Sequence, residues 1–186
     1  MTIQETLGLY GFNKEDIEYT AKVCVEESYA PKQFFLEEGQ ISDRLAIVQS
    51  GLLRTFIFND NADEITTQFH EPNSLILSIE SFNNRVPAKE NIIAVDHSEI
   101  CTITLDNWRK LYNEVPKWQE ICRKSGDYIS MQLLQRTTEL QTMSATERYH
   151  KFCKDHPSVY QKATLGQIAS YLGIDIATLS RIRKKI

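Results

Sequence analysis

LGQIASYLGIDIATLSRIRK, residues 165–184, is the stretch that decides the fold. Its pattern predicts two short helices joined at Gly173, because a glycine readily takes the positive φ that a tight turn between helices needs. Ala169 is small where the two helices must cross. Leu179 and Ile182 fall on the inner face of the second helix, so we expect both to be buried.

The outer face of the second helix is left with short polar and basic side chains. They are Ala177, Thr178, Ser180, Arg181 and Lys184. A helix of this kind fits the major groove of DNA, where an arginine can make a bidentate contact to guanine. We expect Arg181 to make that contact and Thr178 to touch a base or a phosphate. Arg183, Lys184 and Lys185 are predicted phosphate contacts, which supply affinity rather than sequence choice.

Charge divides the chain in the same place. Residues 1–144 hold 13 Lys and Arg against 22 Asp and Glu, whereas residues 145–186 hold 8 against 3. A basic segment attached to an acidic one is typical of a module that meets a polyanion. The alternative is two helices packed for stability with a solvated basic end, which leaves the charge division and the placement of Ala169 and Gly173 unexplained.

The composition is that of an ordinary globular protein, with 186 residues and 41% hydrophobic residues. One domain and a small module fit this length. We expect no signal peptide and no membrane span, and therefore a cytoplasmic location. The four cysteines are scattered and the four histidines are unpaired, so no metal or other cofactor is predicted. No catalytic motif is present, and we expect the protein not to be an enzyme.

Upstream of the quoted stretch, the sequence changes from strand-like to helical spacing. After a short helix expected at residues 13–25, strands are expected at residues 46–48, 52–58, 65–69, 74–79, 92–95 and 100–105. Short strands separated by turn residues favour an antiparallel sandwich or barrel. Asp106 is the expected cap of the helix that follows.

A long helix is expected from Pro116 to Met143. Its apolar residues recur at intervals of three, four or seven, at Trp118, Cys122, Ile129, Leu133 and Leu140. A helix longer than its own domain that carries such a stripe favours a partner helix. We therefore predict a homodimer through this stripe, and the alternative is that the stripe packs entirely against its own chain.

Two further segments carry a family resemblance over nearly the whole chain. FLEEG at residues 35–39 and LAIVQSGLLR at residues 45–54 resemble the opening strands of the cyclic-nucleotide-binding β-roll of the Crp/Fnr transcription regulators. The resemblance implies an α+β fold with three parts. They are an N-terminal antiparallel, jelly-roll-like β-roll sensor at 1–115, a dimerisation helix at 116–143 and an all-α helix-turn-helix domain at 144–186.

The same resemblance implies a transcription regulator that binds a two-fold symmetric operator in double-stranded DNA as a homodimer. It also implies RNA polymerase and an unidentified small-molecule effector as partners. In the family, nucleotide binders hold the cyclic phosphate with a Gly-Glu pair and an arginine. Here only Glu80 and Arg85 stand as ligand-binding candidates, Pro87 removes a donor N–H, and no glycine occurs between Gly51 and Gly126. Control by cyclic AMP is therefore not expected.

Two more departures follow from the family pattern. Only Cys24 lies near the N-terminus, so no iron-sulfur cluster is expected. Ala177 stands where readers in the family often carry a glutamate, so the operator should differ from theirs. The alternative function is an effector-independent protein-interaction module, with a cyclic-nucleotide-binding-like fold and no DNA binding.

Overall fold

Two four-stranded antiparallel sheets form the middle of the computed structural model, which describes residues 2–184. One sheet has the strand order β1-β8-β3-β6 and the other has the order β2-β7-β4-β5. The strands are β1 (Val25–Tyr29), β2 (Phe34–Leu36), β3 (Arg44–Ser50), β4 (Leu53–Phe58), β5 (Glu64–His70), β6 (Leu75–Ile76), β7 (Asn91–Ala94) and β8 (Ser98–Thr104). The predicted β-roll is confirmed.

Strand β3 is apolar along most of its length because both of its faces are covered. Ala46 and Val48 face the interior of the roll, where they pack in one cluster with Ile100 of β8. Leu45 and Ile47 face the other way and join a second cluster under the helices. The sheet is therefore held between the roll interior and a helical layer.

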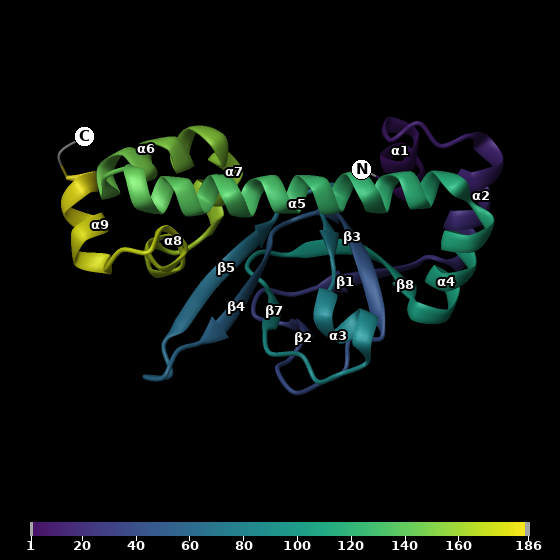
Figure 1. Cartoon of the computed structure of the whole chain (residues 1–186), viewed down its shortest axis with the longest axis horizontal. Helices are drawn as coiled ribbons and strands as arrows, with labels where there is room; N and C mark the ends of the chain where they lie inside the picture. The colour runs from purple at the N-terminus through teal and green to yellow at the C-terminus, as the bar shows by residue number, and fades with distance from the viewer. Residues whose placement is uncertain (1, 185–186) are drawn as a thin grey trace.

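The helices are α1 (Ile3–Leu9), α2 (Lys14–Val23), α3 (Ile79–Asn84), α4 (Leu105–Glu114), α5 (Pro116–Thr142), α6 (Ala145–Asp155), α7 (Pro157–Lys162), α8 (Leu165–Leu172) and α9 (Ile176–Arg183). Apart from α3, which is drawn among the strands, they lie along one side of the roll and beyond it (Figure 1). Helix α5 runs the length of the molecule, with α1, α2 and α4 near its start and α6 to α9 near its end. No helix within residues 2–184 is long and apolar enough to cross a bilayer.

The structure differs from the sequence expectations at three places. Helices α1 and α3 were not expected, and the strand predicted at 74–79 ends early, at Ile76, because Ile79 already begins α3. Helix α4 is capped by the Thr104 side chain, which accepts from the backbone N–H of Asn107, so Asp106 lies inside its first turn rather than at the cap. The 27-residue α5 was expected almost to the residue.

Trp118 belongs to the core of its own chain, contrary to its prediction as a dimer contact. Its side chain is 2% exposed, and its ring packs edge-on against Phe12 and Trp108. Its indole N–H donates to the hydroxyl of Thr20 at 3.1 Å. The stripe on α5 therefore begins inside the protein, where α1, α2 and α4 cover it.

Candidate nucleic-acid interface

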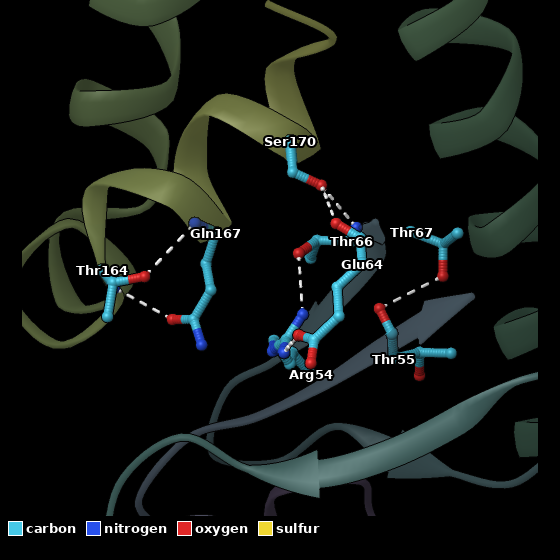
Figure 2. Close-up of polar contacts among 8 residues, drawn as sticks. All are labelled: Arg54, Thr55, Glu64, Thr66, Thr67, Thr164, Gln167 and Ser170. Atoms are coloured by element: carbon cyan, nitrogen blue, oxygen red, sulfur yellow. Dashed lines mark hydrogen bonds and ion pairs between the residues drawn. The ribbon is translucent and has the colours of Figure 1, made fainter. Parts of the chain in front are cut away.

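Helices α8 and α9 begin and turn as their sequence dictates. The Thr164 hydroxyl accepts from the backbone N–H of Gln167 at 3.3 Å, and the Gln167 side chain accepts from the backbone N–H of Thr164 at 2.9 Å (Figure 2). Gly173 ends α8 with φ of 65°, in the left-handed region. Asp175 then caps α9 by accepting from the backbone N–H of Thr178 at 2.8 Å. The pair of helices predicted from residues 165–184 is confirmed. The C-terminal helices α6 to α9, which include this pair, are called the reader below.

The inner face of α9 is buried. Leu179 is fully covered and Ile182 is 8% exposed, and both pack in one cluster with Ile168, Ala169 and Leu172 of α8. Both burial predictions are confirmed. Because these contacts fix the rotation of α9 about its axis, they also determine which side chains face outward.

The outer face of α9 carries Ala177, Arg181 and Lys184, all of them exposed. They lie four and then three positions apart and so share one side of the helix. Arg181 donates to the Thr178 hydroxyl at 3.0 Å, which orients its guanidinium along the helix surface. Thr178 and Ser180 are half-buried at the edges of this face.

The remaining basic residues lie beside this face. Arg183 is exposed, and its guanidinium carbon lies 5.9 Å from the centre of the Tyr160 ring on α7. Lys185 lies outside the described residues. Asp175 is the acidic residue nearest to the face, and hydrogen bonds from Thr178 hold the pKa of its carboxyl below the usual value. It therefore serves as a charged helix cap at neutral pH.

The reader is docked on the edge strand of the roll through Ser170 of α8. Its hydroxyl accepts from the backbone N–H of Thr66 at 2.7 Å and donates to the carbonyl of Glu64 at 3.1 Å (Figure 2). Strand β5 pairs with β4 on its other side only. Ser170 thus satisfies backbone groups on a strand edge that would otherwise face water.

An ion pair supports the docked end of β5 from within the sheet. Arg54 of β4 is 4% exposed, donates to Thr66 at 3.2 Å and pairs with the carboxylate of Glu64 (Figure 2). Its guanidinium also lies over the Phe56 ring, 4.3 Å from the ring centre. A buried guanidinium is retained only with partners of this kind.

Two arginines join the reader to the long helix. Arg136 of α5 donates to the carbonyl of Thr67 at 2.6 Å and to that of Tyr171 at 2.9 Å. Arg148 of α6 donates to the carbonyls of Met143 and Leu172, at 2.7 and 3.2 Å. The carbonyls of Met143, Tyr171 and Leu172 lie at the ends of α5 and α8, where the helix dipole favours a cation, whereas that of Thr67 lies on β5.

Comparison with known proteins agrees with this architecture. Residues 26–115 match the cyclic nucleotide-binding domain family. The transcriptional activator protein Anr of Pseudomonas protegens is 25% identical over an alignment of 165 residues that covers 81% of this chain and 65% of that protein. The chain therefore spans just under two thirds of that relative's length.

Two solved structures share the fold. The c-di-GMP-responsive global regulator CLP of Xanthomonas campestris has a TM-score of 0.72 and 17% identity, over 93% of this chain and 91% of CLP. A regulator of the Crp/Fnr family from Eubacterium rectale has a TM-score of 0.73 and 16% identity, over 94% of this chain and 83% of that one. The chain therefore shares the fold of these regulators.

The two predicted ligand residues make contacts within the protein. Both oxygens of the Glu80 carboxylate accept from Lys89, at 2.9 and 3.0 Å. Arg85 sits in the left-handed region at φ of 58°, and its guanidinium donates to the carbonyl of Ser42 at 2.6 Å. Their role in binding a ligand stays a prediction.

The four other predicted dimer residues remain at least partly accessible. Leu133 is 60% exposed and Leu140 is 47% exposed, while Cys122 and Ile129 are half-buried. Burial raises the pKa of the Cys122 thiol to about 11, so it is neutral at physiological pH. Leu140 also lies close to the turn between α8 and α9. A Cβ placed on Gly173 would be 3.4 Å from the Leu140 side chain.

The residues that join reader and roll were not found by sequence reasoning. The sequence analysis gave Ser170 and Arg136 no role. Their partners are backbone groups on β5 and α8, and a pattern of side chains does not reveal a backbone partner far away in the chain. Within residues 2–184, no three His, Cys, Asp or Glu side chains lie close enough together to hold a metal ion.

Proposed function

We propose that this protein is a DNA-binding transcription regulator that binds a two-fold symmetric operator as a homodimer. The observation that carries the proposal is the orientation of α9, with Leu179 and Ile182 buried and Arg181 exposed. That orientation suits major-groove entry, with the first turns of the helix toward the base edges. Such binding implies a cytoplasmic location.

The roles of the basic residues follow from their positions. Thr178 lies in the first turn of α9 and Arg181 lies one turn further along, and both would meet base edges, with Ser180 at the margin of the contact. Arg183, Lys184 and Lys185 would meet phosphates on either side. The division into a roll at 1–115, a dimerisation helix at 116–143 and a reader at 144–186 is part of the same proposal.

Selection of bound fragments from genomic DNA, followed by a mobility-shift titration, tests the reading of bases. We expect Arg181→Ala to weaken operator binding by about 1–3 kcal/mol and to relax preference at one base pair in each half-site. Arg123→Ala is the matched control, because it removes another exposed arginine, whose side chain is 67% exposed on α5. Equal effects of the two substitutions would contradict the assignment.

Salt dependence tests the phosphate contacts. A dimer that makes about six such contacts should lose on the order of a thousandfold in affinity between about 50 and 200 mM salt. A protein-interaction module that does not bind DNA should produce no shift at either concentration.

The dimer is tested on the exposed stripe of α5. We expect Leu133→Asp to raise the dimer dissociation constant at least about tenfold, because it places a charge in an apolar helix contact. Met131→Asp is the control, since Met131 is 70% exposed and lies about 160° around the helix from Leu133. Sedimentation velocity over a concentration series gives both constants. Dissociation by Met131→Asp instead would place the contact on another face.

Effector and polymerase remain predictions of the family resemblance. Glu80 and Arg85 are bound to protein groups, which supports control by something other than cyclic AMP. An interaction module without DNA binding is not favoured, because it leaves the exposed face of α9 without a role.

A further inference from the structure

A groove separates the hairpin of β4 and β5 from the start of α9. Its volume is about 740 Å³, and it is lined on one side by Asp63, Glu64 and Ile65 and on the other by Asp175, Ile176 and Ala177. A space of this size suits a small molecule and does not admit a duplex. DNA that covers Ala177 must therefore lie directly beside the hairpin or displace it.

The hairpin is acidic where it borders this groove. Asp60 and Asp63 are exposed and form no ion pair with any residue of the described range 2–184, whereas Glu64 is paired with Arg54. Asp63 lines the groove beside the start of α9 and Asp60 lies in the turn of the same hairpin, so both uncompensated carboxylates repel phosphates that approach this end of the molecule. The hairpin thus opposes the basic face that α9 presents.

Several contacts hold the reader in its docked position. Ser170 makes its two hydrogen bonds to the edge of β5, and Leu52, from the turn between β3 and β4, is fully buried in the cluster that forms the core of the reader. Lys162 and Asp96 add an ion pair at 3.0 Å across the same junction. These contacts stabilise the docked arrangement of the reader.

We propose that the hairpin and Ser170 form an autoinhibitory dock, which keeps the reader beside Asp60 and Asp63 until DNA binding releases it. This rests on the proposed DNA-binding function and concerns its regulation. Release breaks the contact between Ser170 and Thr66, so the backbone N–H of Thr66 reports on the dock directly.

The first experiment weakens the charge of the dock. The double variant Asp60→Asn, Asp63→Asn should bind a random-sequence duplex at least about threefold more tightly than the wild type in low salt, and the gain should shrink at high salt as charges are screened. The control is Glu15→Gln with Asp106→Asn, which makes the same charge change on exposed side chains of α2 and α4, far from α9 in Figure 1.

The second experiment weakens the hydrogen bonds of the dock. Ser170→Ala should raise affinity for the same duplex and should speed hydrogen exchange at the Thr66 amide without DNA. Wild-type protein saturated with DNA should show the same faster exchange at Thr66. Tighter binding by the dock variants, even where the wild type gives no shift, supports the proposal.

Three outcomes overturn the proposal. Wild-type binding that the hairpin variant changes no more than its control does refutes the dock and leaves DNA binding intact. Unchanged protection of the Thr66 amide at DNA saturation shows that the reader binds while docked, which also refutes release. Absence of DNA binding by the wild type and by every dock variant refutes the dock and the proposed function together.

Discussion

The interior of the β-roll and the junction between α8 and β5 are both extensive contacts, but they are built from different groups. In the interior, Ala46, Val48 and Ile100 are fully buried among other apolar side chains. At the junction, apolar contacts of Leu52 and Phe69 stand beside hydrogen bonds that Ser170 and Arg136 make with backbone groups. Water can replace the hydrogen bonds but not the apolar packing, so the polar part of the junction is the part that costs least to open.

The largest expected effect lies in the interior. Ile100→Ala should lower the free energy of unfolding by about 2–5 kcal/mol, because it removes buried methyl groups and leaves a cavity between the sheets. Urea denaturation followed by circular dichroism measures the loss. Ile79→Ala is the control, since that side chain is 50% exposed on α3 and should cost under about 1 kcal/mol. Equal losses would mean that the interior is less tightly packed than its burial indicates.

His70 gives a smaller effect that depends on pH. It is buried on β5, where its Nε2 lies 2.7 Å from the Thr55 hydroxyl, and its Nδ1 has no partner within residues 2–184. Burial lowers the pKa of His70 to about 4, so the unfolded state takes up the proton first as pH falls. Stability should be complete above about pH 6.5 and should decline by up to about 3 kcal/mol toward pH 4.

Unfolding midpoints across this pH range test the titration of His70. In His70→Gln the part of the slope that belongs to the imidazole should disappear, while the part due to the carboxyl groups remains. An unchanged slope would show that His70 is protonated in the folded state too.

The smallest effect is expected at the junction. The Glu71 carboxylate accepts from His156 at 2.9 Å and also from the Ser158 hydroxyl, and the bond with His156 holds the pKa of Glu71 below its usual range. Because the carboxylate is partly exposed, Glu71→Gln should cost under about 1 kcal/mol in urea denaturation. A loss as large as that of Ile100→Ala would erase the distinction between junction and interior.

The parts of the fold that could be predicted are those that short-range rules govern. Gly173, Asp175 and the pair Thr164 and Gln167 each act on backbone groups within a few residues, and the structure has each of them as expected. The length of α5 followed in the same way from Pro116 and an apolar period. The inward turn of Leu179 and Ile182 followed from the spacing around a tight turn.

The parts that were missed depend on what lies across the chain. The apolar stripe of α5 is real, but periodicity cannot say whether another helix of the same chain covers Trp118 or a second copy does. Glu80 and Arg85 were plausible ligand residues until Lys89 and the carbonyl of Ser42 proved to be their partners. Ser170 reaches backbone groups 104 and 106 positions away, and no local signal announces such a contact.

Leu52 links the fold of the roll to that of the reader. Gly51, at φ of 92°, makes the sharp turn before it, and any larger residue there would collide with the carbonyl of His97. The turn places Leu52 in one cluster with residues of α8 and α9, which lie more than a hundred positions later in the chain. A reader produced on its own would lack Leu52 and would expose the apolar residues that surround it. Exchanging readers between relatives should therefore succeed only when the loop that carries Leu52 is exchanged as well.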